Sequence, residues 1–228
     1  VYSRKSARRK KCQTDKHKCQ YSLTRLYSHL FSSKLFCKNL FYHSYLLLKK
    51  LLGSRFAEES EIWFGLAQKM GVEISGEYTE NTVDSPFYGV YYGQSALPLE
   101  PDTLKYLTND TLLNCIVTSY NTGIAVEKDM YDMEAATGRD PYEMFLCGSD
   151  ALLTIENPEA ATDKELIIFR DSFGSSLTPL LCEGYAKIYV VDIRYIQSAM
   201  LGNFIDFNNQ DVLFIYSTLL LNSSAAFK

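Results

Sequence analysis

The chain has 228 residues, of which 46% are hydrophobic, 14% aromatic and 22% charged, and its formal net charge is −4 at pH 7. Such a composition is globular and provides a sizeable core, which excludes a low-complexity chain. We expect no membrane-spanning helix, because the most apolar early stretch, residues 46–52, is short and interrupted by Lys49 and Lys50. We also expect no signal peptide, because no apolar core with a small-residue cleavage site follows the basic start.

Charge divides the chain into two parts. Residues 1–55 carry fourteen Lys or Arg and a single acid, Asp15, a net charge of +13. The remaining residues, 56–228, carry nine basic and 26 acidic residues, a net charge of −17. This contrast indicates two kinds of sequence. We interpret residues 1–55 as either a solvated, disordered tail or a reading-frame artefact, and residues 56–228 as one domain that is incomplete on its N-terminal side.

Helix and strand signals follow one another along residues 56–228. In chain order we expect a helix over 58–70, a strand or hairpin arm over 87–94, a strand over 114–119, a short helix from Pro141, a short strand over 152–155, a strand over 166–169, a short helix over 178–183, a strand over 187–192, a helix over 198–204 and a strand over 211–216. Helices thus alternate with the last three strands. This alternation predicts an α/β fold of the flavodoxin-like kind, in which right-handed crossovers place the three parallel strands side by side.

Polar residues follow each of these three strands. Asp171 and Ser172 come after the first, Asp192 and Arg194 after the second, and Ser217 after the third. Because parallel strands end at the same edge of a sheet, we expect these residues to converge where open α/β folds bind ligands.

Ser172 is the candidate nucleophile of this edge. The N–H groups of the following turn, including Gly174, are candidate donors to an oxyanion, and Arg194 is a candidate to stabilise its charge or to hold a substrate carboxylate. Other interpretations remain open at both positions. Asp171 and Ser172 also fit an ordinary helix cap and turn, and Arg194 equally fits a salt bridge to Asp192 or Asp171.

Three runs in this region carry a family resemblance: IIFRDSFGSSLTPLL, VVDIRY and DVLFIYSTLLLNSS. They resemble the C-terminal half of the DHHW family, which is similar to the SGNH-hydrolase-like domains of alginate O-acetyltransferase accessory proteins. The resemblance covers residues 63–224 and is most specific over 165–195. It implies a flavodoxin-like three-layer sandwich with a parallel sheet, and an acyltransferase or esterase that acts on polysaccharide O-acetyl groups through an acyl-serine at Ser172. It also implies a cell-envelope or extracytoplasmic location, and a membrane-bound O-acyltransferase as a partner.

The base that such a serine needs is missing from the family-like part. The family's Asp-His-His-Trp motif, which supplies an Asp-x-His pair, is absent, and the three histidines, His17, His29 and His43, all precede residue 56. A serine hydroxyl is a weak nucleophile without an adjacent base. One local pattern, Thr14-Asp15-Lys16-His17, keeps the Asp-x-His order, so Asp15 and His17 form a candidate acid/base pair. We therefore expect a catalytically incomplete enzyme, with a non-catalytic glycan-binding or accessory protein as the alternative.

We expect no metal and no cofactor. Cys12, Cys19, His17 and His43 match no zinc-finger spacing, and the later cysteines are expected to be small buried residues. The basic segment is a candidate binder of phosphate groups, which makes a nucleic-acid or anionic-membrane binder a third alternative. A nucleic-acid partner is disfavoured, because the acidic remainder of the chain would repel it.

Overall fold

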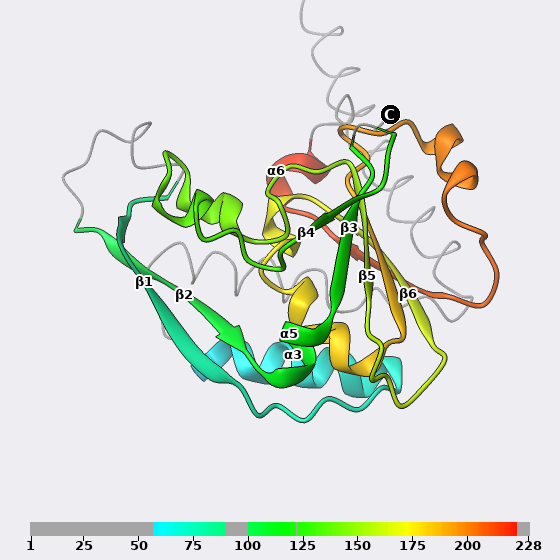
Figure 1. Cartoon of the computed structure of the whole chain (residues 1–228), viewed down its shortest axis with the longest axis horizontal. Helices are drawn as coiled ribbons and strands as arrows, with labels where there is room; N and C mark the ends of the chain where they lie inside the picture. Colours follow the sequence, from blue (N-terminus) through cyan, green and yellow to red (C-terminus); the bar gives the residue numbers. More distant parts are fainter. Residues whose placement is uncertain (1–56, 90–99, 122, 223–228) are drawn as a thin grey trace, which may run out of the picture. The chain divides into compact units, whose positions relative to one another are not determined.

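The computed structural model of the chain describes residues 57–89, 100–121 and 123–222 (Figure 1). The basic segment 1–55, with Asp15 and His17, lies outside the described residues, as do residues 90–94 of the expected aromatic strand. Across the described ranges, no helix has the length and apolar character needed to cross a membrane.

A six-stranded mixed sheet forms the centre of the fold, with the strand order β4-β3-β5-β7-β6-β8. The strands are β3 (Ile116–Ser119), β4 (Val126–Lys128), β5 (Leu152–Glu156), β6 (Glu165–Arg170), β7 (Lys187–Val191) and β8 (Asp211–Ile215). Strand β6 lies between β7 and β8 and is parallel to both, so the prediction of an α/β fold with three adjacent parallel strands is confirmed.

The expectation of a parallel sheet is wrong for the other half. Strand β5 is antiparallel to β7, and β3 is antiparallel to both β4 and β5. The short connection from Glu156 to Glu165 explains the reversal at β5. A parallel arrangement would need a crossover of about a dozen residues or more, whereas a short connection returns the chain at the same sheet edge.

Apolar side chains line both faces of the parallel strands, because successive residues of a strand point to opposite sides. Leu166 and Ile168 belong to one buried cluster, together with residues of α3 (Ala57–Met70), α5 (Asp110–Asn114) and the 3-10 helix η4 (Thr178–Gly184). Ile167 belongs to another, with Leu201 of the 3-10 helix η5 (Ser198–Asn203). This burial on both faces accounts for the continuous apolar runs of β6 and β7.

The predicted helices are present, although most are short 3-10 helices. Helix α3 buries Trp63 and Ala67, and Gly71 ends it in a left-handed conformation with φ +66°. The helix predicted from Pro141 is η2 (Pro141–Met144), which begins where the side chain of Asp140 accepts a hydrogen bond from the N–H of Tyr142.

A hairpin that the sequence pattern does not predict precedes the six-stranded sheet in the chain. Strand β1 (Thr79–Phe87) pairs antiparallel with β2 (Asp102–Thr108), and only Phe87 of β1 falls within the strand expected over 87–94. Strand β1 has the sequence TENTVDSPF and buries only Val83, so its apolar periodicity is weak, and Pro86 further reduces its strand signal. In Figure 1 the hairpin projects to the left of the sheet, beside the 3-10 helices η1 (Ala135–Thr137) and η2.

The packing between η4 and the segment after α3 can be tested by a substitution at Gly184, which lies close to Val72. A Cβ atom at Gly184 would lie 2.8 Å from Cγ2 and 2.9 Å from Cβ of Val72, whereas one at Gly202 would meet nothing within 4 Å. We expect Gly184→Ala to lower the free energy of unfolding by about 1–3 kcal/mol through overpacking. Gly202→Ala, the matched control, should change it by less than about 0.5 kcal/mol. Urea unfolding of both variants measures the difference, and equal midpoints would contradict the close packing at Gly184.

Candidate active site

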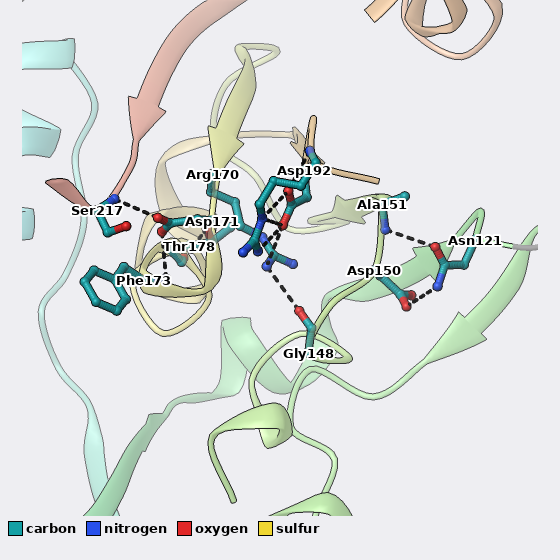
Figure 2. Close-up of polar contacts among 12 residues, drawn as sticks. Asn121, Gly148, Asp150, Ala151, Arg170, Asp171, Phe173, Thr178, Asp192 and Ser217 are labelled. Atoms are coloured by element: carbon teal, nitrogen blue, oxygen red, sulfur yellow. Dashed lines mark hydrogen bonds and ion pairs between the residues drawn. The ribbon is translucent and has the colours of Figure 1, made fainter. Parts of the chain in front are cut away.

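Ser172 lies at the carboxyl edge of the parallel strands. It is the second residue after β6, it begins the 3-10 helix η3 (Ser172–Gly174), and it is exposed. Asp171, the residue that caps this helix, is only 3% exposed. The serine therefore faces solvent on a turn whose first residue, Asp171, is buried. Figure 2 shows the polar contacts around that turn.

Asp171 joins residues 171–175, which we call the serine turn, to the chain after β8 through hydrogen bonds. One carboxylate oxygen accepts a hydrogen bond from the N–H of Phe173 at 3.0 Å, and the other accepts one from the N–H of Ser217 at 2.7 Å (Figure 2). The backbone N–H of Asp171 also donates to the carbonyl of Ile215 at 3.2 Å. From the sequence, Asp171 fits a helix cap and turn or a salt bridge to Arg194, and the structure shows the cap. The hydrogen bond from the backbone N–H of Asp171 to Ile215 extends the pairing of β6 and β8 by one residue, so the turn begins at Asp171.

The backbone N–H groups of the turn are largely engaged. Those of Phe173 and Gly174 donate to the side chain and carbonyl of Asp171, and that of Ser175 donates to the carbonyl of Ser172. Within the described part of the chain, the N–H of Ser172 has no acceptor. A donor on the same residue as a candidate nucleophile is well placed for an oxyanion that would form there.

Gly174, a candidate support for an oxyanion, donates its N–H to the carbonyl of Asp171 at 3.0 Å. Its contribution is steric. A Cβ atom at Gly174 would lie 2.6 Å from Cβ of Arg170, so only glycine lets the turn fold back over the Arg170 side chain.

Arg194 forms the salt bridge that the sequence analysis left open as one of its roles. Its Nη2 lies 2.6 Å from Oδ2 of Asp192, and its Nε donates to both carboxylate oxygens. Asp192 is fully buried, whereas the Arg194 side chain is 27% exposed. Hydrogen bonding to Asp192 raises the pKa of the Arg194 guanidinium. This pair places the Arg194 guanidinium near the end of β7, at the carboxyl edge of the parallel strands.

A second arginine, Arg170, which was not among the site residues predicted from the sequence, is the last residue of β6 and is fully buried. Its Nη1 donates to the carbonyl of Gly148 at 3.1 Å and lies 4.0 Å from Oδ2 of Asp192 (Figure 2). Burial lowers the pKa of this guanidinium. The alternation of side chains along β6 predicts the burial of Arg170, because it shares a face with the buried Leu166 and Ile168.

The turn that accepts this hydrogen bond has an uncommon backbone. The residues Leu146, Cys147 and Gly148 have φ angles of +48°, +57° and +64°. These angles lie in the left-handed region, which residues other than glycine adopt at a cost in conformational free energy. Burial raises the pKa of the Cys147 thiol to about 11. We call residues 146–148 the left-handed turn.

Asp171 and Ser172 follow β6, and Asp192 and Arg194 follow the neighbouring parallel strand β7, so all four lie at the carboxyl edge of these strands. Arg170, at the end of β6, lies 4.0 Å from Asp192. Residues 57–228 contain no histidine. Asp15 and His17 lie outside the described residues, so their pairing with Ser172 stays a prediction. In the described ranges, no group of three or more His, Cys, Asp or Glu residues is arranged to hold a metal ion.

Solved structures share this fold. A DHHW family protein from Eubacterium siraeum has a TM-score of 0.53 at 22% identity, over 71% of this chain and 55% of that one. Bacillus cereus PatB1 has a TM-score of 0.56 at 19% identity, over 76% of this chain and 61% of that one. A second structure of PatB1, with a sulfonyl adduct, has a TM-score of 0.55 at 19% identity, over 75% of this chain and 58% of that one.

The DHHW resemblance is thus confirmed at the level of the fold. The chain spans between 55% and 61% of the length of these structures. No protein-family model matches the chain, and no curated protein matches it.

Asp171 provides a test of how the serine turn is held. We expect Asp171→Ala to lower the free energy of unfolding by about 2–4 kcal/mol, because it leaves two backbone N–H groups without their acceptor at a buried site. Asp171→Asn, which keeps one oxygen, should cost less. Asp132→Ala is the matched control, since exposed Asp132 also accepts from two backbone N–H groups. Urea unfolding compares the three, and a loss in Asp171→Ala no larger than in Asp132→Ala would contradict the tie to Ser217.

Proposed function

We propose that residues 56–228 form an SGNH-hydrolase-like acyl-transfer domain, with a flavodoxin-like three-layer arrangement and with Ser172 as its nucleophile. The observation that carries the proposal is the exposed serine on the turn after the central parallel strand, with its own N–H group unoccupied among the described residues. The PatB1 structure that shares the fold was solved with a sulfonyl adduct, and sulfonyl reagents react with nucleophilic side chains. The substrate class is an O-acetyl group of a polysaccharide, as the family resemblance implies.

The chemistry is a two-step acyl transfer. The Ser172 hydroxyl oxygen attacks the acyl carbonyl carbon while its proton passes to a base, and the carbonyl oxygen becomes an oxyanion. The N–H of Ser172 donates to that oxyanion, and the Arg194 charge lies on the same sheet edge. Collapse of the intermediate breaks the bond between the acyl carbon and the sugar oxygen, which takes the proton back from the base and leaves as a neutral alcohol. The acyl-serine is then attacked by water in an esterase or by an acceptor hydroxyl in a transferase.

The base is the incomplete part of this site. Residues 57–228 contain no histidine, and the Asp15 and His17 pair is the candidate acid/base pair of the chain. The same observation favours a second candidate function, a non-catalytic domain that binds glycan or supports a membrane-bound O-acyltransferase. Both candidates have an extracytoplasmic or cell-envelope location.

Chemical rescue separates the two candidates. We expect the full chain to hydrolyse p-nitrophenyl acetate slowly, and imidazole, as a soluble base, to raise the Ser172-dependent rate by about tenfold or more, since general-base catalysis contributes 10²–10⁴-fold when the base is positioned. Ser172→Ala in the same imidazole gives the background rate. Ser176→Ala is the matched control, because Ser176 follows the same turn and its hydroxyl is 2.9 Å from that of Tyr142. Peptide mass spectrometry locates the acetyl group.

Three outcomes decide between the candidates. An acetyl group on Ser172 that depends on imidazole supports the acyl-transfer site with a missing base. Robust activity without imidazole that His17→Ala abolishes assigns the base to His17. Equal rates for the unmodified chain and Ser172→Ala, with no acetyl group on Ser172, contradict acyl transfer and leave the non-catalytic function.

A further inference from the structure

Arg170 connects three segments that meet at the serine turn. It is the last residue of β6, it donates to the carbonyl of Gly148 at 3.1 Å, and it lies 4.0 Å from Asp192 after β7. We propose that Arg170 is a positioning residue, which holds the left-handed turn and the end of β7 in place against the serine turn at a cost in stability. This inference rests on the proposed function of Ser172.

The aliphatic stem of Arg170 supports the serine turn directly. A Cβ atom at Gly174 would lie 2.6 Å from Cβ, 3.3 Å from Cγ and 3.6 Å from Cδ of Arg170. The turn therefore rests on this stem at a distance that no larger residue at position 174 would permit. Any displacement of Arg170 would pass to Gly174, and from there to Ser172 two residues earlier.

The guanidinium group of Arg170 joins the other two segments. Figure 2 shows it directed toward Asp192 on one side and toward Gly148 on the other. The carbonyl of Gly148 belongs to the left-handed turn, whose backbone conformation is costly for Leu146 and Cys147. A hydrogen bond from a charged donor is about twice as strong as a neutral one, so it can help to hold a turn of this kind.

The charge of Arg170 is poorly compensated. Asp192 makes its short contact with Arg194, at 2.6 Å, and leaves Arg170 at 4.0 Å. The Nε and Nη2 atoms of Arg170 are buried and have no hydrogen-bond partner within the part of the chain that the structure describes. A buried charge with unsatisfied donors lowers stability, and apolar side chains of similar volume often restore it. The guanidinium of Arg170 is therefore not explained by stability of the fold.

Replacement by methionine isolates the guanidinium. Arg170→Met keeps an unbranched stem under Gly174 and removes the charge, and Asp192 keeps its salt bridge to Arg194, so no buried carboxylate is left unpaired. Arg170→Lys keeps a charge but not the planar fork of donors. Arg139→Met is the matched control, because Arg139 is exposed.

The experiment measures three properties of the full chain in each variant. These are the thermal unfolding midpoint, hydrogen exchange of peptides covering residues 146–150 and 171–175, and the rate at which a sulfonyl fluoride modifies Ser172 in imidazole buffer. We expect Arg170→Met to unfold no earlier than the unmodified chain, to exchange faster in both peptides, and to be modified roughly 10- to 100-fold more slowly, because small misplacements of a reacting group have effects of this size. Arg170→Lys should recover part of the rate, and Arg139→Met should match the unmodified chain.

Each other outcome has a defined consequence. A lower unfolding midpoint in Arg170→Met assigns Arg170 to the fold alone and overturns the proposal, whatever the modification rate. An unchanged rate and unchanged exchange also overturn it. If Ser172 of the unmodified chain is never modified, the proposed function fails instead. The exchange data then decide on Arg170 alone: faster exchange in both peptides supports positioning, and unchanged exchange overturns it.

Discussion

The contact between the Asp171 carboxylate and the N–H of Ser217 is the constraint on which the site depends. It joins the residue after β6 to the chain after β8 at 2.7 Å, while the other oxygen of the same carboxylate starts the helix that carries Ser172. One buried side chain thus caps the helix that begins at Ser172 and joins it to the chain after β8. Because the acceptor is a carboxylate and is nearly buried, these hydrogen bonds are stronger than those of an exposed cap.

A group of three charged residues, Asp192, Arg194 and Arg170, lies at the ends of β6 and β7. Asp192 is fully buried and is shared unequally by Arg194 and Arg170. The close pair with Arg194 satisfies the carboxylate, so the more distant Arg170 is the group whose presence needs a functional explanation. Buried ionic groups are weak evidence for stability, and their value lies more often in fixing one arrangement of the surrounding segments. Here those segments are the serine turn, the left-handed turn and the end of β7.

The parts of this fold that can be predicted from sequence are those whose signal is local. Strands β6, β7 and β8 are apolar runs separated by helical patterns, and their parallel order follows from the handedness of crossovers. Strand β1 has no such signal, because only Val83 of its nine residues is buried. The exposed position of Ser172 follows from the strand and turn pattern. The contacts of Arg170 do not, because Gly148 and Asp192 lie on either side of it in the chain, each about twenty residues away, and a distant contact leaves no periodic trace.

The geometry of the serine turn requires no histidine. Its cap, its backbone hydrogen bonds and its support by Arg170 all come from residues 148–217, at the ends of strands that pair with one another. The base of an acyl-transfer site is therefore a separate structural element, which the same sheet edge can receive or lack without rearrangement of the turn. Fold and catalytic competence are separable for this reason. A domain of this kind can keep the turn that carries the candidate nucleophile whether or not a base is present.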